Sequence, residues 1–206
     1  SIFSMAPGST IHTDAEIRFD QRANLRVSNL MKTGSGTLGL YHRRGTIVPL
    51  GGTTTIDEGT IVVNRPGIVD DNSDFVINDG GRFRLHLNSN TTTIGAVQVN
   101  DGGTLTVGGG SSSPTLVVSG LAGTSGATVS SGSSYGGFPA SPRTLIIDQD
   151  SDTVFSGTVQ GYDTAGDDSI LRFIKRGTGN IAFDGIIGIG SGFQTTNEIR
   201  EGGLYL

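Results

Sequence analysis

The chain contains no cysteine and no tryptophan. Without cysteine it can form no disulfide, no thiolate metal site and no cysteine nucleophile. No apolar run is long enough to cross a bilayer. The net charge is −5 and the basic residues are scattered, which does not match the basic patch of a nucleic-acid-binding protein. These absences argue against a membrane-spanning segment and a nucleic-acid partner.

Hydrophobic residues make up only 34% of the 206 residues, and aromatic residues 6%. A narrow solenoid needs less apolar material than a compact globule, because small inward side chains stack in files along its axis. Glycine, at 34 residues, is far above its ordinary share of about 7%. Disorder is the competing interpretation of such a Gly/Ser-rich chain.

Strict alternation of apolar and polar residues excludes disorder locally. Within Arg82–Leu87, the side chains of Phe83, Leu85 and Leu87 fall on one face of a strand, and the cations fall on the other. Burying each large apolar side chain contributes about 1.5–3 kcal/mol. The apolar face is therefore predicted to point inward.

Two segments recur at one fixed offset. Lys32–Leu38 reappears as Lys175–Ile181, and Ile56–Ile61 reappears as Ile199–Leu204. The offset is 143 residues in both cases (175 − 32 and 199 − 56). Repetition of a β-type unit without net insertion predicts a stacked solenoid.

Polar corners with glycine recur at shorter steps. Val76–Gly81 has a near twin in Gln98–Gly103, and Asp57–Gly59 lies one similar step earlier. Glycine takes positive φ at a corner without steric cost, and Asp or Asn bonds to the turn backbone. Hairpin turns are the alternative explanation, but the regular spacing favours stacked rungs of about 20–24 residues.

The sequence therefore predicts an all-β protein, a right-handed parallel β-helix or β-solenoid with protruding Gly/Ser-rich loops. The alternative fold is an antiparallel β-sandwich. We expect a single domain over residues 1–206, with a loop insertion at 108–143 because Gly and Ser dominate that region. Within it, Thr115–Val118 has the composition of a strand. A linker between two short solenoids is the other interpretation of the region.

Phe155–Val159 and Leu171–Ile181 resemble the autotransporter-associated β-strand repeat, whose core reads sG-x-I … L-x-K-x-G-x-G-x-L-x-L. The strand T-x-I-x-x-G-x-L that follows in the family is similar to Thr195–Leu204. A first copy lies within residues 25–63, and the second within 155–206. The resemblance implies a parallel β-helix in the passenger region of a large secreted or surface-attached bacterial protein. It places the chain outside the cell or on the bacterial cell surface.

Acidic residues form three clusters that a glycan-cleaving β-helix could use. They are Asp70, Asp71 and Asp74; Asp148, Asp150 and Asp152; and Asp167 with Asp168. Turn composition explains all three clusters without catalysis. The second cluster also resembles the start of a calcium loop, but Thr153 replaces the required Gly and Val159 the required Glu. An irregular calcium site there stays open as an alternative.

The remaining candidates are weaker. His12, His42 and His86 lack ligand spacing. The cluster Tyr41–Arg44 is basic and aromatic, and is either a contact for a glycan or partner or an exposed corner. Lys32 and Lys175 stand at a repeat position, which predicts a structural role. We therefore expect no catalytic, cofactor-binding or metal-binding residues, and no cofactor.

The expected function is that of a non-catalytic structural or adhesive β-solenoid, either a surface passenger segment or a fibre-forming subunit. The alternative is a carbohydrate-active β-helix enzyme or a phage tailspike-like glycan-binding protein. Expected partners are the chain itself, in a head-to-tail homo-oligomer or filament, or surface glycans and proteins. No nucleic acid and no membrane span are expected. Because Leu204–Leu206 stops in mid-pattern, we expect that the polypeptide continues or that a neighbouring copy covers this end.

Overall fold

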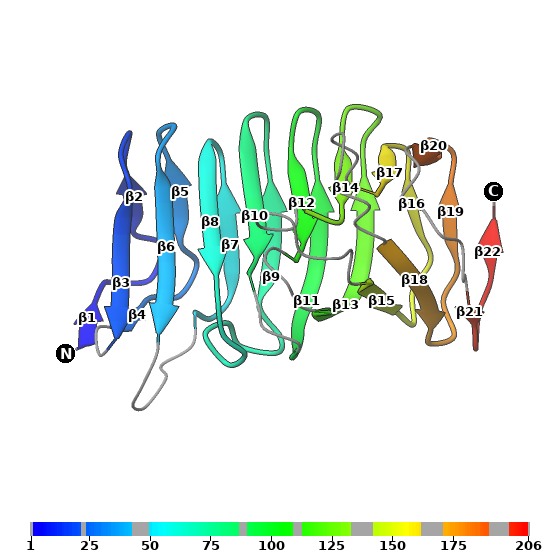
Figure 1. Ribbon diagram of the computed structural model, residues 1–206, viewed down its shortest axis with the longest axis horizontal. Coiled ribbons are helices and arrows are strands. Elements are labelled where there is room, and N and C mark those ends of the chain that lie inside the picture. The colour runs from blue at the N-terminus through cyan, green and yellow to red at the C-terminus, as the bar shows by residue number, and fades with distance from the viewer. Residues whose placement is uncertain are drawn as a thin grey trace.

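The computed structural model describes residues 2–21, 24–42, 50–86, 90–108, 113–132, 142–161, 171–189 and 198–205. These residues form strands, turns and bridges and contain no helix. All strand pairs are parallel, and each strand pairs with a strand one rung away. Figure 1 shows the rungs stacked along the long axis of the molecule, with the two termini at opposite ends. The chain is thus a parallel β-solenoid, and an antiparallel sandwich is excluded.

The larger of two main ladders, the twelve-strand sheet, runs the length of the solenoid. Its main path, in order, is β2 (Thr10–His12), β5 (Met31–Thr33), β7 (Thr53–Ile56), β9 (Asp74–Ile77), β11 (Thr91–Val99), β13 (Thr115–Gly123), β15 (Arg143–Asp148), β18 (Leu171–Arg176) and β21 (Glu198–Ile199). A branch from β13 contains β16 (Thr153–Phe155), β19 (Ile181–Phe183) and β22 (Leu204–Tyr205).

The second ladder is the eight-strand sheet. It contains β3 (Ile17–Gln21), β6 (Thr37–His42), β8 (Gly59–Val63), β10 (Gly81–Leu85), β12 (Thr104–Val107), β14 (Thr128–Ser130), β17 (Thr158–Gln160) and β20 (Ile186–Ile189). A third, short ladder pairs β1 (Ile2–Ser4) with β4 (Asn24–Arg26). Further along the chain, isolated parallel bridges pair Gly51 with Ser28 and Leu50 with Val69.

Rung length follows from the strand register. Thr10 pairs with Met31 and Thr91 pairs with Thr115, steps of 21 and 24 residues. These steps confirm the predicted spacing. Later rungs are longer, because Thr115 pairs with Thr144, 29 residues on.

Residues 113–132 carry two regular strands, β13 and β14. The strand predicted at Thr115–Val118 within the 108–143 region is thus the start of β13, and both strands pair in register with neighbouring rungs.

The core consists of files of inward side chains at equal register. In the eight-strand sheet one file contains Ile17, Leu38, Ile61, Phe83, Leu105, Val129, Val159 and Ile187. Phe83 and Leu85 are fully buried while Arg82 is exposed. This confirms the predicted direction of that face; Leu87 lies outside the described residues. The Phe83 ring also packs on Phe75 from the other sheet, at 4.3 Å between centroids.

The corners between the two sheets use the predicted residue types. Gly59, Gly80 and Gly102 have φ of 71°, 74° and 74°, a region that side chains with a Cβ rarely adopt. Beside them an amide ladder crosses the rungs. Asn78 Nδ2 donates to Asp57 Oδ1 at 2.5 Å, and Asn100 Nδ2 donates to Asn78 Oδ1 at 2.7 Å.

In the described ranges, no helix is long and apolar enough to cross a membrane.

Candidate functional site

The chain has only two lysines, Lys32 and Lys175, and both are fully buried. Each occupies an inward position of the twelve-strand sheet, with an isoleucine in register on both sides. Lys32 lies in register between Ile11 and Ile56. Lys175 lies in register between Ile147 and Ile199. The apolar stem of each lysine can therefore pack as a core residue while its ammonium group reaches the next corner.

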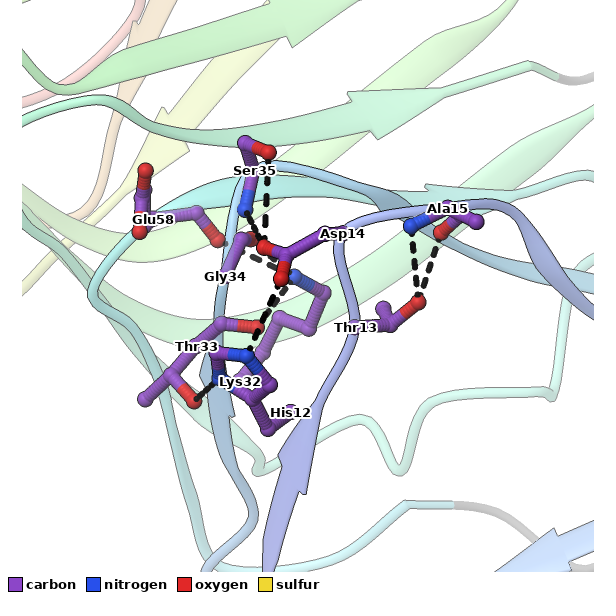
Figure 2. Close-up of polar contacts among 9 residues, drawn as sticks. All are labelled: His12, Thr13, Asp14, Ala15, Lys32, Thr33, Gly34, Ser35 and Glu58. Atoms are coloured by element: carbon purple, nitrogen blue, oxygen red, sulfur yellow. Dashed lines mark hydrogen bonds and ion pairs between the residues drawn. The ribbon is translucent and has the colours of Figure 1, made fainter.

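The ammonium group of Lys32 is enclosed by backbone carbonyls, as Figure 2 shows. Its Nζ donates to the carbonyl oxygens of Thr33 at 2.7 Å, Gly34 at 2.6 Å and Glu58 at 3.2 Å. A protonated lysine has three N–H donors, which matches the three acceptors. The cage joins the corner of its own rung to the corner of the following rung.

Lys175 is also held by three carbonyls, but its third acceptor, Gln149 O, lies on the preceding rung and not on the following one. Its Nζ donates to the carbonyl oxygens of Arg176, Gly177 at 2.8 Å and Gln149 at 3.4 Å. Gly34 and Gly177 both have positive φ, at 77° and 75°. In each turn, the carbonyl oxygens of the two residues that follow the lysine accept hydrogen bonds from its amine. The K-x-G motif is thus a lysine followed by the turn that it closes, which is the structural role predicted for both lysines.

Burial lowers the pKa of both lysines below the ordinary value of a lysine amine. For Lys32, the nearby carboxylates of Glu58 and Asp14 oppose this effect. For Lys175 the opposing carboxylates are led by Asp148 and Asp150. In both cases desolvation is the larger cause, because the amine is surrounded by protein and not by water.

Carboxylates at the corners accept backbone N–H groups from the next rung. Asp14 Oδ1 accepts from Ser35 N at 3.1 Å, and Asp101 Oδ1 accepts from Gly126 N at 2.9 Å. The backbone bond from Ser35 is the main cause that lowers the pKa of Asp14. For Asp101, a side-chain bond from Thr124 lowers the pKa most, followed by the Gly126 bond.

The predicted cluster Asp148, Asp150 and Asp152 does not converge on one point. Asp150 Oδ1 accepts the Thr178 amide at 3.1 Å, and Asp152 Oδ1 accepts the Asn180 amide at 2.8 Å. Hydrogen bonds from the backbone and the side chain of Thr178 lower the pKa of Asp150. Asp148 forms an ion pair with Arg176 at 3.1 Å. The three carboxylates thus have separate partners on the following rung.

The other acidic clusters are likewise used locally. Asp70 Oδ1 accepts the Asn72 amide at 3.0 Å within its own turn, and Asp74 Oδ1 accepts the Ala96 amide at 2.7 Å. Asp71 is exposed. Asp167 and Asp168 lie outside the described residues. Within the part of the chain that the structure covers, no three His, Asp or Glu residues form a group that could hold a metal ion.

The histidine and aromatic candidates are dispersed. His12 is exposed, with its ring nitrogens 3.0 Å from Thr33 Oγ1 and 3.3 Å from Asp14 Oδ2. Burial and the charge of Arg84 lower the pKa of His86. Arg43 and Arg44, and the side chain of His42, lie outside the described residues.

Tyr41 has a partner that sequence inspection did not identify. The guanidinium of Arg18, on the neighbouring strand, lies 4.3 Å from the centre of the Tyr41 ring, a distance at which a cation is attracted to the ring face. Gly39 lies under the same ring, where a Cβ would overlap it. The tyrosine is therefore packed between its own strand and Arg18.

Gln149 is a second residue that sequence reasoning missed. It is fully buried, and its Nε2 donates to Asn180 O at 2.6 Å and Ser151 O at 3.0 Å. Its carbonyl oxygen also accepts from Lys175. Nothing in the sequence signals this role, because Gln149 stands among exposed acidic residues.

Neither a family of known proteins, nor a curated protein, nor a solved structure matches this chain. The corner ammonium groups and several corner carboxylates are bonded to backbone of the same or the adjacent rung. This arrangement stabilises the stacking of rungs.

Proposed function

We propose that this chain is a non-catalytic structural or adhesive β-solenoid of the bacterial cell surface, part of a passenger region or a fibre. The observation that carries the proposal is the use of its corner residues. Lys32, Lys175, Asp14, Asp150 and Asp152 each bond to turn backbone. Charged groups engaged in this way stabilise an elongated scaffold and leave its lateral faces for contact.

The resemblance to autotransporter-associated repeats supports the extracellular assignment. Its K-x-G-x-G core corresponds to the lysine cages at Lys32 and Lys175. The second glycine of the motif also has a steric reason, because a Cβ at Gly36 or Gly179 would overlap the backbone of the preceding rung. The motif therefore marks a corner of stacked rungs, as a passenger stalk requires.

Association with a second copy is supported by apolar side chains at the two ends of the ladders. Exposed large apolar residues on the end strands are Ile17 on β3, Ile186 on β20, Ile199 on β21 and Tyr205 on β22. Among the described residues β3, β20, β21 and β22 each pair with one strand only, and an edge of this kind can be extended by another strand. A solenoid stacked on either end would cover these edges.

Electron microscopy across a concentration series tests this association, with Ile186→Lys as the disrupting variant. Val154 is the matched control, because it is also about half exposed but lies on β16, which is paired on both sides. We expect assemblies that lengthen with concentration, that are lost in Ile186→Lys and that persist in Val154→Lys. Equal behaviour of the two variants would refute end stacking.

The enzymatic alternative is tested by incubating the purified chain with a panel of polysaccharides and measuring new reducing ends. We expect no release. Release that disappears in Asp148→Ala, Asp150→Ala or Asp152→Ala, with the fold intact by circular dichroism, would overturn the non-catalytic proposal.

A further inference from the structure

Two arginine side chains project from the outer face of the eight-strand sheet without a carboxylate partner. On β10 the residues Gly81, Phe83 and Leu85 are buried, so Arg82 and Arg84 point away from the core. Arg82 is exposed and Arg84 half-buried. Among the described residues neither arginine forms an ion pair, and the Nε of Arg84 has no hydrogen-bond partner.

Hydroxyl groups flank the exposed arginine. Arg82 lies in register between Thr60 on β8 and Thr104 on β12, strands that Figure 1 shows side by side. Thr104 is followed in the same register by Thr128 and Thr158. All four threonines are partly exposed. Neighbouring strands are about 4.8 Å apart, so this row is a straight line of donors and acceptors along the solenoid axis.

The strands around the two arginines are free of negative charge. None of β6, β8, β10, β12, β14 and β17 contains Asp or Glu. The acidic residues belong instead to the corners that precede these strands. One of them, Asp101, is bonded to the Gly126 amide. Arg82 and Arg84 are thus the charged side chains of these strands, while Glu58 and Asp79 lie at the corners that precede β8 and β10.

We propose that this face binds a linear polysaccharide that carries carboxylate groups, a polyuronate, with Arg82 and Arg84 holding the carboxylates. The planar guanidinium group presents paired donors that match a carboxylate oxygen pair. The two arginines are two residues apart on one strand, which separates their Cα atoms by about 6.6 Å. The proposal rests on the adhesive function proposed above and names its ligand.

The balance of charge and hydroxyls favours a polysaccharide over a nucleic acid. Nucleic acids carry a dense line of phosphates and require many cations for affinity. Here two unpaired arginines stand among neutral threonines. A uronic-acid polymer carries hydroxyls beside each carboxylate, and Thr60 and Thr104 can donate to or accept from those hydroxyls.

Affinity electrophoresis with polygalacturonate in the gel tests the proposal. We expect the wild-type chain to be retarded, and Arg82→Gln and Arg84→Gln each to weaken binding about tenfold or more, since a hydrogen bond to a charged group contributes about 1.5–3 kcal/mol. Arg26→Gln is the matched control. It removes the same charge from an exposed arginine on β4, in a different ladder, and should leave the affinity within about twofold.

Two threonine variants test whether the face recognises the hydroxyl groups of the polymer. Thr60→Val and Thr104→Val keep every charge and suit a strand. Each should weaken binding about two- to tenfold, the range for one neutral hydrogen bond. Unchanged binding in both variants, with loss in the arginine variants, would show recognition of charge alone and would overturn the assignment to a sugar polymer.

Further outcomes separate the ligand proposal from the proposed function. Absence of binding to polygalacturonate, equal binding to neutral dextran, stronger binding to double-stranded DNA, or equal loss in Arg82→Gln and Arg26→Gln would each overturn the site. If Arg84→Gln unfolds, the exposed Arg82→Gln still decides the result.

Reducing ends are measured on the same samples. Cleavage of polygalacturonate would refute the non-catalytic function, whereas an intact and unbound polymer would refute only the docking site.

Discussion

Lys32 and Lys175 occupy equivalent places in the solenoid, each replacing one aliphatic residue in a file that contains isoleucine on both sides. The chain contains no other lysine. Their amines meet turn carbonyls at the same two following positions, Thr33 and Gly34 in one case and Arg176 and Gly177 in the other.

Replacing either lysine by methionine should destabilise the protein. Methionine fills the file but leaves the turn carbonyls around Lys32 or Lys175 without a donor. The cost of leaving buried acceptors unpaired leads us to expect a loss of about 2–4 kcal/mol in the free energy of unfolding. Urea denaturation measures it, with Arg26→Met as an exposed control that should change stability by less than about 0.5 kcal/mol. A stabilised Lys32→Met variant would show that removing the buried charge outweighs the loss of the cage.

Amine-reactive acylation should distinguish the folded from the unfolded chain. Because both lysines are fully buried, we expect the folded protein to be modified at its α-amino group and at neither Lys32 nor Lys175. After denaturation in urea both lysines should react. Mass spectrometry of the intact chain and of its peptides gives the count and the position. Rapid labelling of Lys175 in the native protein would contradict its burial.

Two glycines of equal backbone conformation should differ in their tolerance of alanine. Gly59 and Gly80 have φ of 71° and 74°, so each Ala variant carries a backbone cost of about 1–2 kcal/mol. A Cβ at Gly59 would also overlap the carbonyl oxygens of Gly36 and Gly34, whereas at Gly80 the nearest atom is Glu58 Cγ at 3.6 Å. We expect Gly59→Ala to be the more destabilising by thermal denaturation. Equal melting temperatures would contradict the close packing of these corners.

Stability should fall in acid because the folded state lowers the pKa of Asp14, Asp101 and Asp150. A carboxyl group whose pKa is lowered on folding stabilises the protein above its unfolded-state pKa, which for an aspartate is near the ordinary value of 3.8. That contribution is lost as pH falls from there through the folded-state pKa, because the unfolded chain binds more protons. Urea midpoints between pH 7 and pH 2 should therefore decline at the acid end, and less steeply in Asp150→Asn. An identical pH dependence in the variant would refute the role of this carboxylate.

Particular residues show how far sequence reasoning reached. Alternation placed Phe83 and Leu85 inside and Arg82 outside, and the glycine corners at Gly80 and Gly102 were located correctly. These features depend on neighbours close in the chain, so local pattern is sufficient to predict them. Residues 108–143 were assigned to a loop insertion with a strand at Thr115–Val118, because Gly and Ser dominate that region. Its strands are stabilised by pairing with rungs on both sides. Amino-acid composition alone does not predict that pairing.

The equivalence of Asp14 and Asp150 was not visible in the sequence. Both carboxylates accept the amide that follows the glycine of a lysine corner, at Ser35 and Thr178. The two acceptors are not separated by the 143-residue offset of the repeat, because the rung that precedes Lys175 is longer than the one that precedes Lys32. An insertion changes the spacing in sequence but not the contact, since the extra residues leave the register at the corner unchanged.

The sequence by itself determined the class of fold, the rung corners and the inward faces, because a strand alternates with a period of two and a corner requires glycine whatever lies beyond it. Only the tertiary structure decided what the charged residues do. It placed Lys32 and Lys175 within carbonyl cages and bonded corner carboxylates to the next rung. The contacts between rungs join residues about one rung apart in the chain, and strand register determines which of them meet.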